Sequence, residues 1–184
     1  TMRRFFTAAL TCVLCLTCGL LPVSAALKAV YNSFDDFPLV RGESGFMYEF
    51  SEDGTAFADM SSNGTNTWFV NPGNWDTSWA QKNQISLKTG PWVSLSFLAP
   101  YSGSVTLADN TSLNTSQPLL YKSMHNERVL TEKSIDQLGD SFNVTNETIQ
   151  VKKGDCIRVV FKNNGTADTT VWYQLKVAYE QIDT

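Results

Sequence analysis

The sequence predicts an all-β protein, a two-sheet antiparallel β-sandwich of jelly-roll type. The first observation is alternation: apolar residues recur at every second position over residues 143–153, 156–161 and 170–179, which places them on one face of each strand. The second is the chemistry of the intervening turns. Lys153-Gly154-Asp155 and Asn163-Asn164-Gly165 contain residue types that adopt positive φ at low cost. Together these patterns predict hairpin-linked antiparallel strands with little helix.

Many other short segments of the chain favour strands and are separated by Gly, Asn and Pro, which is typical of two packed sheets. The predicted strands cover residues 29–33, 46–50, 57–60, 68–70, 85–87, 92–99, 103–108, 119–122, 128–130, 143–146, 147–151, 156–162 and 171–179. A helical turn is predicted only over residues 132–138. In the strand over residues 92–99, alternation places Val93, Leu95 and Phe97 toward the core and the intervening serines away from it.

Residues 1–25 are predicted to be a signal peptide. Arg3-Arg4 precede an apolar stretch over residues 5–21, and Pro22-Val23-Ser24-Ala25 supplies a small-residue cleavage pattern. A transmembrane anchor is disfavoured because the apolar run is short for a bilayer span. We therefore expect a secreted, extracellular protein whose residues 26–184 form one domain, with no membrane insertion after cleavage.

Removal of this segment changes the composition of the remaining chain. Three of the four cysteines would be lost, leaving Cys156 without an intramolecular partner. The full chain has a formal net charge of −4, and loss of the leader arginines makes the domain more acidic. Its lysines and arginines are scattered rather than clustered with aromatics, so a nucleic-acid partner is not expected.

The sequence contains little that predicts catalysis. His125 is the only histidine and lies in a predicted hairpin tip, so no Ser-His-Asp set is visible. Cys156 follows Gly154-Asp155 at a strand start, with no evident thiolate-stabilising group. A pair of carboxylates for glycoside hydrolysis is not excluded, because their separation in space cannot be derived from the sequence. The prediction is a non-enzyme with no cofactor.

Tryptophans provide the stronger functional signal. Trp68, Trp75 and Trp79 fall in a Gly/Pro/Asn-rich stretch that also contains Asn74 and Asp76. An indole stacks on the apolar face of a sugar ring, and amide and carboxylate groups bind sugar hydroxyls. The alternative is that these indoles cap the hydrophobic core. We expect core packing for Trp68, because a strand continues from it, and leave both roles open for Trp75 and Trp79.

Trp172 is out of phase with the core positions of its strand, Val171, Tyr173 and Leu175. It is therefore expected to point outward, as a binding platform or as a seat for a covering loop. Trp92 is expected at the rim of the sandwich, packing a turn.

The order and spacing of these elements resemble a carbohydrate-binding-module-like jelly-roll domain of secreted and surface proteins of Firmicutes, often found beside glycoside hydrolase or dockerin domains. The matching segments, which together cover nearly the whole chain after the leader, are residues 42–48, 57–60, 68, 93–97, 99–103, 149–155, 168–172 and 178–179. Two segments depart from the family pattern, Thr89-Gly90-Pro91-Trp92 and residues 109–117.

The resemblance implies a polysaccharide or glycan ligand and, in many such modules, a structural calcium ion between loops. Candidate oxygen donors for that ion are Asp53, Asp59 and Asp168.

The sequence thus predicts a secreted, non-catalytic carbohydrate-binding module, with Trp75, Trp79, Trp172, Asn74 and Asp76 at the ligand. The alternative is a structural or protein-interaction domain of the bacterial cell surface that binds other surface proteins and no sugar. Carbohydrate binding predicts an exposed indole beside a groove. The alternative predicts that all five tryptophans are buried.

Overall fold

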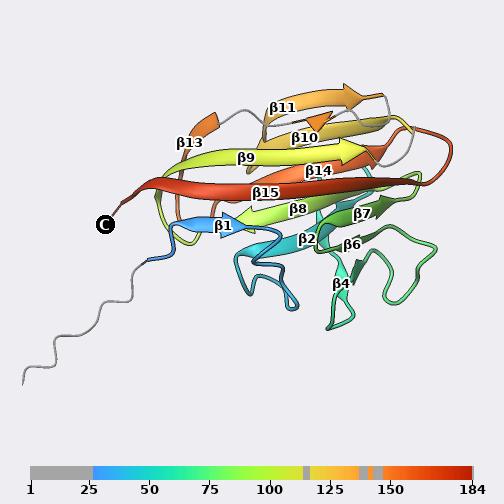
Figure 1. Cartoon of the computed structure of the whole chain (residues 1–184), viewed down its shortest axis with the longest axis horizontal. Coiled ribbons are helices and arrows are strands. Elements are labelled where there is room, and N and C mark those ends of the chain that lie inside the picture. The colour runs from blue at the N-terminus through green and yellow to red at the C-terminus, as the bar shows by residue number, and fades with distance from the viewer. Residues whose placement is uncertain (1–26, 114–116, 137–140, 143–146, 184) are drawn as a thin grey trace, which may run out of the picture.

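The computed structural model describes residues 27–113, 117–136, 141–142 and 147–183 (Figure 1). The predicted signal peptide and the predicted strand over residues 143–146 lie outside the described residues. Within the described part of the chain, no helix is long and apolar enough to span a bilayer.

The strands form two sheets whose named strand pairs are all antiparallel. The six-stranded sheet has the order β11 (Arg128–Ile135), β10 (Leu119–His125), β14 (Cys156–Asn163), β8 (Trp92–Leu98), β2 (Phe46–Ser51) and β3 (Ala58–Asp59). The nine-stranded sheet has the order β12 (Ser141–Phe142), β9 (Gly103–Leu113), β15 (Thr169–Ile182), β7 (Gln84–Leu87), β6 (Trp79–Gln81), β5 (Trp68–Phe69) and β4 (Ser61–Ser62), with β1 (Val30–Asn32) on β15 and β13 (Glu147–Val151) on β9.

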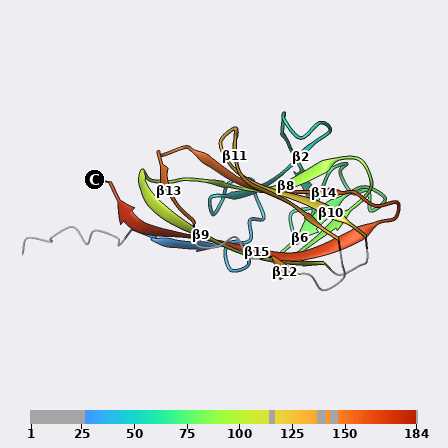
Figure 2. The same ribbon diagram turned by 90° about the horizontal axis from the view of Figure 1, so that it is seen from above.

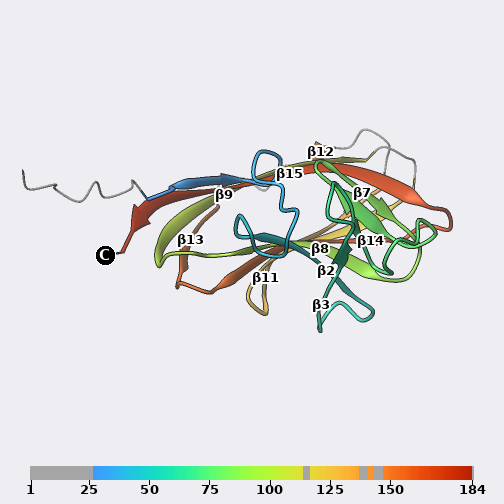
Figure 3. The ribbon, with the colours of Figure 1, turned by 90° about the horizontal axis from the view of Figure 1, so that it is seen from below.

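The two sheets stack as layers, seen edge-on in Figures 2 and 3. The chain crosses repeatedly between them: β8 lies in one sheet, β9 in the other, β10 and β11 back in the first, and β14 and β15 in different layers again. Such crossing, with antiparallel pairing throughout, defines a jelly-roll sandwich. The predicted fold class is therefore confirmed.

The main core lies between the layers, where the inward faces of both sheets meet. Val93, Leu95 and Phe97 of β8 are fully buried there, as the alternation predicts. The outward serines Ser94 and Ser96 are also fully buried, because further side chains cover this face.

That covering includes a second apolar cluster, formed by Trp92, Met124 and Val160 with Phe57 packed on it. Gly54, in the loop after β2, lies against the Trp92 indole: a Cβ there would be 2.8 Å from Nε1. Trp92 is thus a buried residue of this cluster, with 7% of its surface exposed.

The predicted helical turn over residues 132–138 is wrong where the structure describes it. Residues 132–135 continue β11, which pairs with β10 from His125–Arg128 to Leu119–Ile135. The weak local preference for a helix is overridden by this backbone pairing and by burial of Ile135 in the main core.

Candidate functional site

The outer face of the nine-stranded sheet carries an exposed tryptophan. Val171, Tyr173 and Leu175 of β15 point into the core, and Trp172 alternates with them. The side chain of Trp172 is accordingly 41% exposed, which confirms its outward orientation. Trp68, by contrast, is a core residue at 3% exposure, and its Nε1 donates a hydrogen bond of 2.9 Å to the Pro38 carbonyl.

The strand register places Trp79 on this same outer face. Trp79 lies opposite Ser86 of β7, and Ser86 lies opposite Thr170 of β15. Directly opposed residues of antiparallel strands point to the same side of a sheet, and Thr170 is two positions from Trp172. Trp79 and Trp172 therefore lie on the same surface with β7 between them, although they are far apart in the sequence.

Trp79 belongs to a small aromatic cluster with Phe69 and Trp75. The Trp75 ring meets Phe69 edge-on with ring centroids 4.8 Å apart, and meets Trp79 edge-on at 5.5 Å. Phe69 is outward-facing, opposite Trp79, yet only 2% exposed, whereas Trp75 is 52% exposed. Trp75 thus both covers Phe69 and presents half of its own surface to solvent.

The loop between β5 and β6 positions Trp75 through hydrogen bonds of its polar residues. Asn74 Oδ1 accepts from the Asp76 backbone N–H at 2.9 Å, and Thr77 Oγ1 donates to the Asn74 carbonyl at 2.8 Å. The Asn74 backbone N–H donates to the Asn71 carbonyl at 3.1 Å. The structure therefore brings the predicted site residues Asn74, Trp75, Asp76 and Trp79 together.

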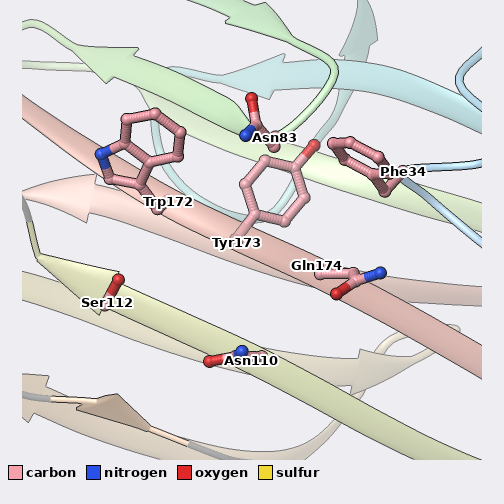
Figure 4. Close-up of a pocket in the computed structure, with 7 residues that line it drawn as sticks. All are labelled: Phe34, Asn83, Asn110, Ser112, Trp172, Tyr173 and Gln174. Atoms are coloured by element: carbon pink, nitrogen blue, oxygen red, sulfur yellow. The ribbon is translucent and has the colours of Figure 1, made fainter.

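A shallow pocket of about 340 Å³ lies beside Trp172 (Figure 4). It is lined by Phe34, Asn83, Asn110, Ser112, Trp172, Tyr173 and Gln174. Ser112 lies opposite Trp172, and Asn110 lies opposite Gln174, on the neighbouring strand β9. These polar residues could not be predicted from the sequence, because only the strand register places them beside the indole.

The polar groups of this pocket are available to a ligand. Gln174 Nε2 donates to Asn32 Oδ1 at 2.9 Å, which leaves its Oε1 as an acceptor. Among the described residues, the side chains of Asn83, Asn110 and Ser112 have no hydrogen-bond partner. The lining thus combines one exposed indole with uncharged donors and acceptors.

The three carboxylates predicted to hold calcium do not form a cluster. Asp53 accepts from the backbone N–H groups of Thr55 at 2.8 Å and Ala56 at 3.2 Å, and these bonds, the Thr55 one foremost, hold its pKa well below the usual range. Asp59 pairs with Arg41 at 2.7 Å.

Asp168, the third candidate, pairs with Lys88. Among the described residues, no three His, Cys, Asp or Glu side chains lie close enough together to hold a metal ion. Calcium binding at one of these aspartates stays a prediction, and backbone carbonyl oxygens would have to supply the other ligands of the ion.

His125 and Cys156 lie together at one end of the six-stranded sheet. His125 Nε2 is 2.8 Å from Asp155 Oδ2, and Asn126 Nδ2 donates to Asp155 Oδ1 at 3.1 Å. The Lys152 backbone N–H also bonds to Asp155 and contributes most to lowering its pKa. These contacts join the β10–β11 hairpin to the turn before β14.

Burial raises the pKa of the Cys156 thiol to about 11, so the thiol is protonated at neutral pH. Within the described residues, Cys156 is a free, buried cysteine.

No family model and no curated protein matches this chain. Several solved structures are similar at low identity. One is the native structure of a family 35 carbohydrate-binding module from Clostridium thermocellum: identity is 13%, the TM-score is 0.33, and the match covers 60% of this chain and 87% of that chain.

Another is the CBM36-1 domain of a multidomain xylanase from the hindgut metagenome of Trinervitermes trinervoides, at 14% identity and a TM-score of 0.41, covering 74% of this chain and 99% of that chain. A third is a Podospora anserina GH26-CBM35 β-(1,4)-mannanase, at 10% identity and a TM-score of 0.38, covering 76% of this chain but 29% of that chain. At such values the likeness assigns no ligand and no site to this chain.

Proposed function

We propose that this protein is a secreted, non-catalytic carbohydrate-binding module that holds its ligand on the outer face of the nine-stranded sheet. The observation that supports this most is the 41% exposed indole of Trp172 beside a shallow pocket with unpaired amide and hydroxyl groups. A sugar ring stacks its C–H face on the indole, and its hydroxyls exchange hydrogen bonds with Asn83, Asn110 and Ser112.

The aromatic cluster supplies a second contact region on the same face. Trp75, with 52% of its surface exposed, is the indole most open to solvent, and Trp79 supports it edge-on. Asn74 and Asp76 are exposed on the same loop and serve as hydrogen-bond partners for hydroxyls around the Trp75 ring. Stacking with few charged contacts gives modest affinity, so attachment to a multivalent polysaccharide would benefit from avidity.

The exposure of the tryptophans favours this function over the structural or protein-interaction alternative. That alternative predicts five buried indoles, whereas Trp75 and Trp172 are both exposed large hydrophobic side chains. The exposed part of an indole buries no apolar surface on folding, whereas contact with a sugar ring would remove that surface from water.

The proposal is tested by isothermal titration calorimetry against soluble polysaccharides of plant and host origin. Trp172→Ala is expected to lose most of the binding enthalpy for the glycan that the unaltered protein binds. Val129→Ala is the matched control, since Val129 is 42% exposed but belongs to the six-stranded sheet. Binding unchanged in Trp172→Ala, or lost equally in both variants, would contradict the proposal.

A further inference from the structure

The geometry points to one continuous binding path for an uncharged, linear oligosaccharide, which runs across β7 from the Trp75–Trp79 cluster to Trp172. This inference rests on the proposed function and adds the charge class and minimum size of the ligand. It assigns the two aromatic regions to a single site rather than to two independent ones.

The spacing of the indoles sets the size of the ligand. Trp79 and Trp172 are separated by two strand-to-strand steps, through Ser86 and Thr170, and by two residues along β15. With about 4.8 Å between strands and about 3.4 Å per residue, their Cα atoms are on the order of 12 Å apart. Stacked rings contact at centroid separations of about 4.5–7 Å, so one sugar ring cannot stack on both indoles.

The surface between the two indoles is uncharged and polar. Its outward positions are the partly exposed Gln84 on β7, Gln81 on β6 and Thr170 on β15, together with Ser86 on β7, which is only 8% exposed. Gln84 lies directly opposite both Gln81 and Trp172. The amides of Gln81 and Gln84 therefore form a line across the strands that leads to Trp172 and its pocket. Gln81 Nε2 donates to Thr67 Oγ1 at 3.1 Å, which leaves its carbonyl oxygen as an acceptor for a hydroxyl.

Two lysines border this path. Lys88 pairs with Asp168, and Lys82 Nζ lies 4.1 Å from the centre of the ring of Phe34, which lines the Trp172 pocket. The described residues that line the Trp172 pocket carry no formal charge. Over β7, a carboxylate or sulfate group on the ligand would lose water against amides and hydroxyls rather than against a cation, which is costly. The path therefore selects neutral sugars.

A ligand that reaches both indoles gains a second stacking contact without a second loss of translational freedom. We expect the longest oligosaccharide of a neutral series to bind at least about tenfold more tightly than the disaccharide. Trp79→Ala should remove that gain, so that the hexasaccharide binds no more tightly than the disaccharide.

The test is calorimetric titration of the full chain with gluco-, xylo- and manno-oligosaccharides from the monosaccharide to the hexasaccharide, with oligogalacturonides as the charged series. Support requires affinity that rises with length in a neutral series, negligible binding of the charged series, and loss of the length effect in Trp79→Ala. Equal affinity of disaccharide and hexasaccharide, or tighter binding of the charged series, overturns the continuous neutral path but leaves carbohydrate binding standing. Failure of every series to bind overturns the proposed function and the path with it.

Trp79 lies directly opposite the buried Phe69 and meets Trp75 edge-on, so Trp79→Ala can fail to fold. A second measurement avoids this: indole N–H signals of the unaltered protein in ¹H–¹⁵N correlation spectra, assigned with Trp→Phe variants. The hexasaccharide is expected to shift the Trp79 and Trp172 signals together, and the disaccharide to shift only the Trp172 signal. A hexasaccharide that shifts Trp172 alone contradicts the path.

Discussion

Tyr121 donates its hydroxyl hydrogen to Asp109 Oδ2 at 2.7 Å inside the sandwich, where Asp109 is only 4% exposed. Thr111 Oγ1 donates to the other carboxylate oxygen at 2.7 Å. Burial nevertheless outweighs these bonds and raises the pKa of Asp109 to about 6. A single acidic group in the core is thereby coupled to folding near neutral pH.

This coupling predicts a stability profile. Because the folded pKa of about 6 exceeds the ordinary aspartate pKa of 3.8, the folded state holds the Asp109 proton more tightly than the unfolded state does. The stabilisation that proton binding to Asp109 gives the folded state is greatest below about pH 4 and is lost as the pH rises through about 6. The loss is on the order of 3 kcal/mol. Asp109→Asn should flatten this dependence between pH 4 and 7.

Urea unfolding of the protein and of Asp109→Asn at several pH values measures the effect. Asp136→Asn is a suitable control, because Asp136 is exposed. If the free energy of unfolding varied with pH equally in the unaltered protein and in Asp109→Asn, the pKa of Asp109 would not be raised by folding.

A second prediction concerns the ion pair between Glu49 and Arg158. Arg158 Nε donates to Glu49 Oε2 at 3.0 Å, and the Glu49 side chain is only 6% exposed. Arg158→Met leaves that carboxylate buried without its cation and should lower the free energy of unfolding by about 3 kcal/mol. The double variant Glu49→Gln/Arg158→Met should recover part of the loss in chemical denaturation. If Arg158→Met were as stable as the unaltered protein, the ion pair with Glu49 would not stabilise the fold.

A third prediction separates two costs of replacing a glycine. Gly54 has φ +80° and lies against Trp92, whereas Gly73 has φ +70° and no heavy atom within 4 Å of an added Cβ. Both alanine variants carry backbone strain of about 1 kcal/mol, but only Gly54→Ala also displaces an indole. Gly54→Ala should therefore be the less stable variant and change the near-UV circular dichroism. Identical stability of the two would rule out the Trp92 contact.

A fourth prediction concerns Trp75, which covers Phe69 and is also proposed to stack on sugar. Trp75→Ala should cost about 1–2 kcal/mol of stability through its two lost aromatic contacts, leave the fold intact and lower the affinity for long oligosaccharides toward that for the disaccharide. Trp75→Phe should retain part of the stability and part of the glycan affinity. Calorimetry and thermal unfolding measure the two effects separately. Full glycan affinity in Trp75→Ala would exclude this indole from the site.

Much of the fold was predictable because alternation in β14 and β15 reports directly which side chains face the core. The same phase argument predicted the exposure of Trp172. Trp79 was harder: it lies in a Gly/Pro/Asn-rich stretch that predicts a loop, yet it begins β6 and packs outward on Phe69. Its strand exists because β7 and β5 pair with it on either side, and such pairing is not visible in local sequence.

The pocket residues illustrate the same limit. Asn110 and Ser112 are ordinary polar positions in a β-strand until the register places them beside Gln174 and Trp172. Asn83 contributes from the turn between β6 and β7. Three segments far apart in the chain meet at one indole, and only tertiary pairing determines that meeting.

Carbohydrate binding by exposed indoles on the outer face of the nine-stranded sheet can be tested by iodide quenching of tryptophan fluorescence. The quenching is measured with and without a saturating glycan that calorimetry has identified. We expect iodide to quench the exposed Trp75 and Trp172 and bound glycan to protect them, with less protection in Trp172→Ala. Indoles that remain equally quenchable in the presence of every glycan would contradict it.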